Sequence, residues 1–283
     1  MTEIIEVKNL LFEYPNGFRA IDGVNLSIKK GEVIAIVGQN GSGKTTLVRH
    51  FNRLLKPTRG EVLVEGMPTD NATIAEVSRK VGYVFQNPNH QLFCKTVMEE
   101  LEVGPNNFKL SVVEKKKNIN ETIDLLELTE MMDKHPLTLD YTSKKILTIA
   151  SVLTFNPEVV IMDEPTGGLD EEGRILLSKI IKKLKSQGHT VIMISHDMDF
   201  VAENVERVVV MAHGKILCDS VVSEAFSNAE IMKNACIEPP QITQLSQLLS
   251  NNKVASLSVE EFVKSKKTKG DHKYGNENIC WSK

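Results

Sequence analysis

Residues 32–46 read EVIAIVGQNGSGKTT. The almost unbroken apolar run over 32–37 is typical of a short strand that is covered on both faces in a parallel or mixed sheet. Three glycines follow within the next six residues, and a helical pattern then runs from Lys44 to Leu55. A buried strand, a glycine-rich turn and a helix in this order predict a phosphate-binding loop, or P-loop.

The chemistry of this loop suits a bound nucleotide. Glycine allows successive backbone N–H groups to turn inward around a phosphate oxygen, and the following helix adds its positive dipole end. The Lys44 ammonium can reach the β- and γ-phosphates, and the Thr45 hydroxyl can ligate Mg²⁺. We therefore expect the nucleotide to bind at Gly38, Asn40, Gly41, Ser42, Gly43, Lys44, Thr45 and Thr46. A glycine-rich turn of a dinucleotide-binding fold is the alternative, but that fold does not require the Lys-Thr pair.

Two adjacent acids follow another apolar run. Residues 159–162 are Val-Val-Ile-Met, and Asp163 and Glu164 stand at the end of this predicted strand. Asp163 would hold the magnesium shell through water, and Glu164 could orient and deprotonate the attacking water. A purely structural acidic cap at the end of a strand is the alternative, and the P-loop earlier in the chain favours the catalytic interpretation.

The composition disfavours several classes of function. The chain has 283 residues, with 34 Lys+Arg against 37 Asp+Glu, so its net charge is −3. This balance argues against a strongly basic nucleic-acid binder, and an aromatic content of 5% argues against a base-stacking surface. Four scattered cysteines without a CxxC pair indicate a reduced, cytosolic setting. Because we find no secretory signal and no run of roughly 18 apolar residues, we expect other subunits to provide any membrane part.

The order of the predicted elements gives an α/β fold with several parts. Strand patterns on either side enclose 87–155, which has helical spacing and no strand signal. We expect residues 1–227 to form one domain with a mixed-sheet core, into which 87–155 is inserted as a helical subdomain. Residues 228–264 read as a small helical appendage, in which Ser258 caps the start of a helix. The polar, lysine-rich residues 265–283 are predicted to be a disordered tail.

The motifs follow one another in an order that resembles the ATP-binding cassette (ABC) ATPases over roughly residues 2–225. After the P-loop come Gln86 behind a strand, the helical insertion, Asp163-Glu164, Pro165 to Asp170, and Ile194 to Asp197. Within this family the chain looks most like the ATPase subunit of energy-coupling factor importers, which take up vitamins, cobalt or nickel. The stretches that carry this closer similarity are 84–93, 99–107 and the C-terminal unit up to about residue 264.

The resemblance implies ATP as the nucleotide, Mg²⁺ as the metal, and roles for further residues. Tyr14 would stack on adenine, with a simple turn tyrosine as the alternative. Gln86 would contact the metal or the water and sense the transporter side. His196 would lie against the γ-phosphate and link it to Glu164, while Asp170 would contact the other subunit. Catalysis is thereby assigned to Lys44, Gln86, Glu164 and His196, and metal binding to Thr45, Gln86 and Asp163.

One segment departs from the family pattern. ABC ATPases form head-to-tail dimers, in which each ATP lies between one subunit's P-loop and the other's signature segment, normally Leu-Ser-Gly-Gly-Gln. The matching residues 139–143 are Leu-Asp-Tyr-Thr-Ser here, so the signature is degenerate over Asp140 to Lys144. The hydroxyl donor is lost, and the two glycines that permit close backbone approach are replaced by Tyr141 and Thr142. A structural role for Asp140 as a helix N-cap is the alternative, and the two readings are compatible.

We therefore expect an ATP-hydrolysing subunit that powers substrate uptake by an energy-coupling factor type importer. The expected partner is a second ABC ATPase subunit with an intact signature, in a heterodimer with asymmetric sites. A transmembrane coupling subunit and a substrate-binding membrane subunit would complete the complex at the cytoplasmic face of the cell membrane, and no nucleic acid would take part. The alternative is a soluble or regulatory ABC ATPase with little turnover and no transport role.

Overall fold

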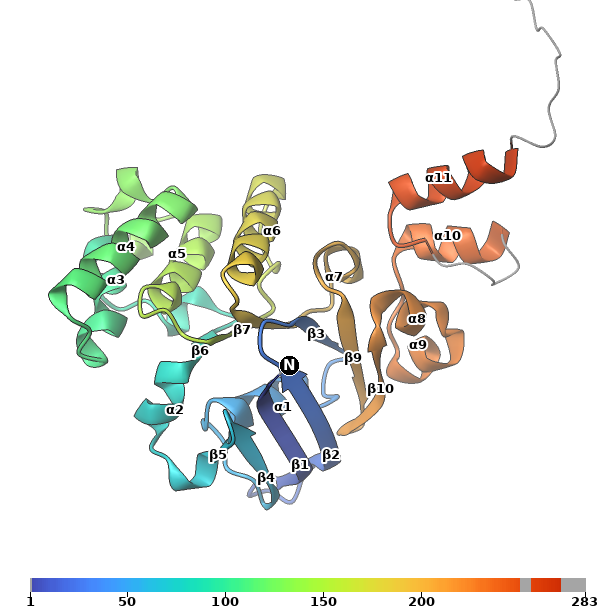
Figure 1. Ribbon diagram of the computed structural model, residues 1–283, viewed down its shortest axis with the longest axis horizontal. Helices are drawn as coiled ribbons and strands as arrows, with labels where there is room; N and C mark the ends of the chain where they lie inside the picture. Colours follow the sequence, from blue (N-terminus) through green and yellow to red (C-terminus); the bar gives the residue numbers. More distant parts are fainter. Residues whose placement is uncertain (1, 250–255, 271–283) are drawn as a thin grey trace, which may run out of the picture.

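The computed structural model describes residues 2–249 and 256–270, and its largest element is a six-stranded sheet (Figure 1). The strand order is β10-β9-β3-β8-β7-β6. These strands are β3 (Val33–Val37), β6 (Val81–Val84), β7 (Val159–Asp163), β8 (Thr190–Ile194), β9 (Arg207–Ala212) and β10 (Lys215–Val221). Neighbours are parallel except for β9 and β10, which pair antiparallel at one edge. The mixed sheet at the core of the predicted α/β fold is confirmed.

A second, antiparallel sheet packs against one face of the first, in the order β2-β1-β4-β5. Its strands are β1 (Glu3–Glu13), β2 (Arg19–Lys29), β4 (Arg59–Val64) and β5 (Met67–Pro68). Alternate residues of a strand point to opposite faces of its sheet. Ile34 and Ile36 of β3 accordingly join the core shared with the second sheet, whereas Ala35 and Val37 join the core shared with the helices. This double coverage explains why every position of β3 is apolar.

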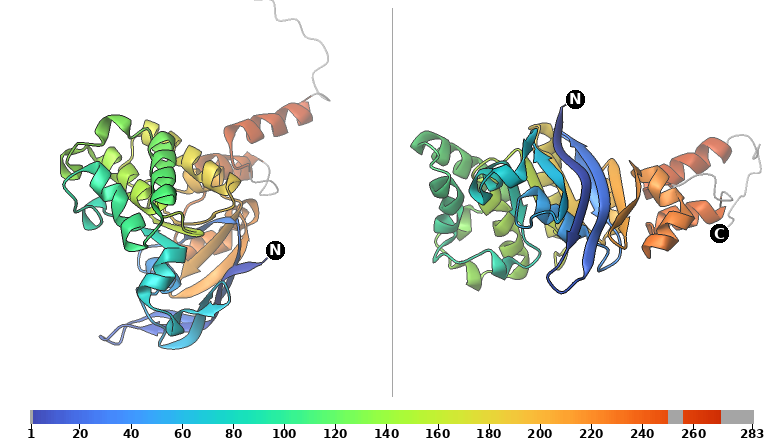
Figure 2. Two further views of the ribbon diagram at one scale, coloured as in Figure 1. Left: turned by 60° about the vertical axis from the view of Figure 1, so that its left-hand side comes forward. Right: turned by 90° about the horizontal axis from the view of Figure 1, so that it is seen from below.

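The helices between β6 and β7 form a lobe beside the six-stranded sheet (Figure 2). They are α3 (Val97–Asn107), α4 (Val112–Leu126) and α5 (Tyr141–Leu153), and both α3 and α4 pack against α5. All three fall inside the range 87–155. The other helices before residue 221 are α1 (Lys44–Phe51), α2 (Ile74–Lys80), α6 (Glu171–Ser186) and α7 (Met198–Asn204). Among the described residues, no helix has both the length and the apolar character that a membrane crossing requires.

In the described part of the chain, four helices follow the last strand: α8 (Val222–Ser227), α9 (Ala229–Ala235), α10 (Gln241–Leu249) and α11 (Val259–Gly270). The predicted cap of α11 is confirmed, because the N–H of Glu261 donates to the Ser258 hydroxyl at 3.2 Å. The helix continues to Gly270, so residues 265–270 are helical where a disordered tail was predicted. Lysine is a good helix former and no glycine intervenes before 270, which accounts for the longer helix. The rest of the predicted tail, 271–283, lies outside the described residues.

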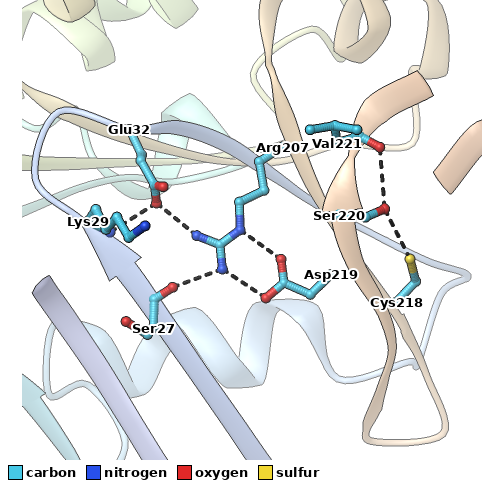
Figure 3. A network of polar contacts seen from close by, with 8 residues as sticks. All are labelled: Ser27, Lys29, Glu32, Arg207, Cys218, Asp219, Ser220 and Val221. Carbon is cyan, nitrogen blue, oxygen red and sulfur yellow. Dashed lines mark hydrogen bonds and ion pairs between the residues drawn. The ribbon is translucent and has the colours of Figure 1, made fainter. Parts of the chain in front are cut away.

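Arg207, the first residue of β9, joins the two sheets (Figure 3). Its Nε and Nη2 atoms donate to the Asp219 carboxylate of β10 at 2.7 and 2.8 Å. Nη1 donates to the Glu32 carboxylate at 2.8 Å, and Nη2 also donates to the Ser27 carbonyl of β2 at 2.9 Å. A guanidinium group suits such a site, because its fork of donors serves several acceptors at once. The start of β3, which leads into the P-loop, is therefore fixed to both sheets.

Candidate functional site

The P-loop lies between the end of β3 and the start of α1. Gly43 caps α1 with φ 103°, and Gly38 has φ 149°; both angles lie in a region that residues with side chains rarely adopt. A Cβ on Gly43 would lie 2.6 Å from the Ala20 carbonyl oxygen, and one on Gly38 would lie 2.1 Å from the Met211 carbonyl oxygen. Both positions therefore require glycine, and the loop turns tightly over the end of the sheet.

Two polar groups inside this loop suit a phosphate ligand. Lys44 is 6% exposed, and its Nζ donates to the carbonyl oxygens of Gly38 and Gln39 at 2.7 and 3.0 Å. Burial lowers the pKa of Lys44, and the charges of the two acids at the end of β7 oppose that effect. The Ser42 hydroxyl is buried and has no hydrogen-bond partner among the described residues. A ligand rich in acceptor oxygens would satisfy both groups.

A cavity of about 180 Å³ lies beside the loop. Nine of the residues predicted for the site line it: Asn40, Gly41, Gly43, Lys44, Thr45, Thr46, Gln86, Asp163 and Glu164. They come from the P-loop, from the segment after β6 and from the end of β7, so the parallel sheet brings together three distant parts of the chain. The hydroxyl, amide and carboxylate oxygens of Thr45, Gln86 and Asp163 are suitable donors for Mg²⁺. The residues present therefore fit both a nucleotide phosphate and its metal.

Asp163 has a partner that the sequence did not predict. The Tyr83 hydroxyl of β6 donates to the Asp163 carboxylate at 2.7 Å, and both side chains are buried. Burial, followed by the charge of Asp163, raises the pKa of Tyr83, so the phenol stays protonated and remains a donor. A tyrosine inside an otherwise apolar strand was the available signal, because a buried phenol nearly always finds a hydrogen-bond partner.

Glu164 and His196 meet as the family resemblance implied. The Nδ1 atom of His196 lies 2.6 Å from the Glu164 carboxylate, whose same oxygen accepts from the His196 backbone N–H at 3.3 Å. Glu164 has φ 48°, and its own N–H donates to the Ile194 carbonyl at 3.0 Å. Its side chain is 9% exposed, whereas that of His196 is 68% exposed. The carboxylate is thus held in one orientation at the cavity wall, which a general base requires.

Tyr14 does not line the cavity. Its hydroxyl lies 3.1 Å from the Thr46 hydroxyl, and its ring packs edge-on against Phe12 at 4.9 Å between centroids. Phe18 lines the cavity instead and is 55% exposed. The sequence did not single out Phe18, since a lone aromatic residue carries no pattern. Adenine stacking by Tyr14 stays a prediction.

The segment from Asp140 to Lys144 lies at the start of α5. Asp140 is the N-cap, because its carboxylate accepts from the N–H and the hydroxyl of Ser143 at 2.8 and 2.7 Å. The same N–H group is the main cause that lowers the pKa of Asp140. Tyr141 lies over Gly168, where an added Cβ would come within 2.5 Å of the tyrosine ring. Asp170 similarly caps α6, accepting from the Gly173 N–H at 2.8 Å. Both acids are exposed, so a further contact outside this chain is open to them.

The chain matches a family model described as ABC transporter over residues 21–167. An ABC transporter ATP-binding protein from Caldanaerobacter subterraneus subsp. tengcongensis is 42% identical over 260 residues, which make up 92% of this chain and 45% of that protein. The chain thus spans less than half the length of this relative. The energy-coupling factor transporter ATP-binding protein EcfA from Methanocaldococcus jannaschii is 39% identical, with 91% of this chain and 92% of that protein covered.

Two solved structures share the fold. CbiO1 from Clostridium perfringens, part of the ABC transporter complex CbiONQ, matches with a TM-score of 0.75 at 33% identity, covering 88% of this chain and 100% of that one. An ATP-binding cassette in a dimeric post-hydrolysis state, bound to ADP and phosphate, matches with a TM-score of 0.70 at 29% identity, covering 77% and 98%.

Proposed function

This chain belongs to the ABC transporter ATP-binding family, and on that premise we propose that it is the ATP-hydrolysing subunit that powers uptake by an energy-coupling factor type importer. The relatives named as energy-coupling factor ATP-binding proteins support the subfamily, because the similarity covers nearly the whole of both chains. The substrate would be selected by other subunits. The work assigned to this chain is ATP binding and hydrolysis at the cytoplasmic face of the cell membrane.

The observation that carries the proposal is the convergence of phosphate-binding, metal-binding and proton-accepting groups on one cavity. Lys44 and the P-loop N–H groups would bind the phosphate oxygens, and Tyr83 would orient Asp163 toward the metal shell. Mg²⁺, when bound, would neutralise charge on the β- and γ-phosphates. Glu164, oriented by His196, would accept a proton from the attacking water. The contact between Glu164 and His196 also argues against a regulatory subunit with little turnover.

We further propose a heterodimer with asymmetric sites. In a head-to-tail dimer, the Asp140 segment of this chain would face the partner's ATP. A carboxylate about 4 Å from a unit phosphate charge costs on the order of 4 kcal/mol at an effective dielectric near 20. The lowered pKa of Asp140 supports a charged side chain at neutral pH. The ATP site formed by the partner's P-loop and the Asp140 segment of this chain would therefore be weak. The other ATP site, built on Lys44 and Glu164 of this chain, needs an intact signature segment from a different chain.

A groove beside the Gln86 loop is the proposed contact for a transmembrane coupling subunit. It has a volume of about 270 Å³ and is lined by apolar and polar side chains, including Leu54, Phe85, Gln91 and Phe93. Phe93 is 74% exposed, which is unusual for so large an apolar side chain. An amphipathic helix laid across this groove would cover that surface.

Replacement of Lys44 by alanine tests the nucleotide site directly. We expect the Kd for ATP, measured by fluorescence titration of the full-length chain, to rise at least about 100-fold, because a charge-assisted contact to phosphate is lost from a buried position. Lys182→Ala, on the exposed face of α6, is the control and should leave the Kd unchanged. Wild-type affinity in Lys44→Ala would refute the site.

A further inference from the structure

Lys145, near the start of α5, is completely buried, with 0% of its surface exposed. Lysine is almost never buried to this degree unless its charge is paired. Here its Nζ donates to a backbone carbonyl, that of Gln86, at 2.5 Å. The neighbouring Lys144 is partly exposed, as is usual. Burying this ammonium group costs folding free energy, and it is buried where α5 contacts the segment that carries Gln86.

This contact belongs to a set that attaches residues 85–94 to the helical lobe. Gln91 accepts from the N–H of Phe85 at 3.1 Å and donates to the Thr148 carbonyl of α5 at 2.9 Å. Glu100 of α3, which is buried, accepts from two N–H groups of the segment at 3.0 and 2.8 Å. The segment that carries Gln86 is thus bound to α5 at two points and to α3 at a third.

The Lys145 ammonium group also interacts electrostatically with the two acids of the site. Burial lowers the pKa of Lys145 to about 8, and the charges of Asp163 and Glu164 act in the opposite direction. Gln86, whose backbone Lys145 holds, lines the cavity together with both acids. Through its hydrogen bond to Gln86, Lys145 connects the start of α5 to a residue that lines the cavity with both acids.

We propose that Lys145 is a positioning residue for ATP hydrolysis. It fixes the backbone of Gln86 to α5 and so keeps Gln86 in place beside Asp163 and Glu164 in the cavity wall. The inference rests on the proposed function and adds a residue outside the motifs that line the cavity. The same helix begins with Asp140, which would face the partner's nucleotide, so a movement of α5 would displace Gln86 as well. ATP binding at the P-loop does not involve Lys145.

The test compares turnover with binding in one variant. Lys145→Met keeps the side-chain length, and it removes the desolvation cost of a buried charge, which offsets the loss of the donor to the Gln86 carbonyl. In the complex purified through a tag on this full-length chain, we expect kcat to fall about 10- to 100-fold, since small errors of position are costly in catalysis. The KM for ATP and the thermal midpoint should stay near wild type. Lys182→Met, on the exposed face of α6, is the control and should change none of these values.

Two further measurements make the result decisive. Hydrogen exchange over residues 85–91 of the full-length chain should be faster in Lys145→Met and unchanged over the P-loop. Lys145→Gln, whose side chain is too short to reach the same carbonyl, should likewise lower kcat and leave the KM for ATP unchanged. This variant replaces Lys145→Met in the test if the methionine variant does not fold. A kcat within about twofold of wild type in both variants would overturn the inference. A parallel loss of turnover, ATP affinity and thermal midpoint would do so too, because that pattern marks damage to the fold.

Glu164→Gln in the same complex separates this inference from the proposed function. If that variant hydrolyses ATP at the wild-type rate, the proposed function itself is wrong. If it is inactive while the Lys145 variants turn over at full rate, the proposed function stands and Lys145 has no positioning role.

Discussion

At the scale of single residues, Tyr83 decides how Asp163 is presented to the cavity. Its hydroxyl occupies one carboxylate oxygen at 2.7 Å. Because burial and the carboxylate charge raise the pKa of Tyr83, the phenol remains a donor throughout the physiological range. The second oxygen of Asp163 would then be available to the proposed metal shell. Partners that orient a metal ligand in this way commonly change metal affinity or activity 10- to 100-fold when they are removed.

Tyr83→Phe tests this role with two readouts. The Mg²⁺ concentration for half-maximal ATPase activity of the complex should rise at least about tenfold. The free energy of unfolding of the chain without nucleotide should fall by about 1–3 kcal/mol in urea titrations, because a buried carboxylate loses its donor. Lys182→Ala, on the exposed face of α6, is the control and should change neither value. An unchanged Mg²⁺ requirement together with unchanged stability would show that the hydroxyl does not orient Asp163.

The sequence predicts site residues where a local pattern places them. Lys44 begins a helix after a glycine turn and Asp163 ends an apolar strand, so their neighbours reveal them. Tyr83 could not be assigned, because its partner lies 80 residues further along the chain and the pairing of β6 with β7 is a tertiary event. For the same reason Phe18 was not recognised, and the Tyr14 hydroxyl was not expected to contact Thr46.

At the scale of elements, the start of α5 packs on the turn that leads into α6. Tyr141 covers Gly168, which has φ 77°, and a methyl group of Thr142 would lie 2.8 Å from a Cβ on Gly173. Tyr141 and Thr142 thus pack closely against glycines of the facing segment. The asymmetry that we propose between the two ATP sites therefore begins in the packing of this chain itself.

Gly168→Ala tests that packing. The left-handed backbone alone should cost about 1–2 kcal/mol of unfolding free energy, and the clash with Tyr141 should add to it. In the double variant with Tyr141→Ala, the clash should disappear and only the backbone cost remain. Gly167→Ala is the matched control, since its added Cβ would make an ordinary contact at 3.5 Å. If Gly168→Ala lowers the unfolding free energy equally in the wild-type and Tyr141→Ala backgrounds, residue 168 and Tyr141 are not in steric conflict.

Elements with a strong local signal were predictable, whereas the edge strand β10 and the end of α11 were not. The apolar runs of β3 and β7 predicted buried strands. β10 was missed, because it lies at the edge of the sheet and only every second residue of its stretch is partly covered. The end of α11 was also missed, since the lysines after residue 264 favour a helix as readily as a tail. Pairing with β9 makes residues 215–221 a strand, and helix propensity extends α11 to Gly270. Hydrophobic periodicity predicts neither.

At the scale of the whole molecule, we propose that the chain has one complete catalytic site and one altered contact surface. The residues proposed for binding and hydrolysis line the cavity around Lys44, and Asp140 and Tyr141 stand at the start of α5, where the resemblance implies serine and glycine. A dimer of identical chains would place two such surfaces against two nucleotides. A dimer with a different cassette would complete the Lys44 site and leave the other site weak.

The most direct test is steady-state ATPase activity of the complex with the catalytic glutamate removed from one cassette at a time. We expect slow turnover by this chain alone and rapid turnover after assembly with a partner that carries Leu-Ser-Gly-Gly-Gln. Glu164→Gln should then abolish the activity, whereas the same change in the partner should leave most of it. Rapid turnover by this chain alone that Glu164→Gln abolishes, or equal losses from the two substitutions, would contradict the account.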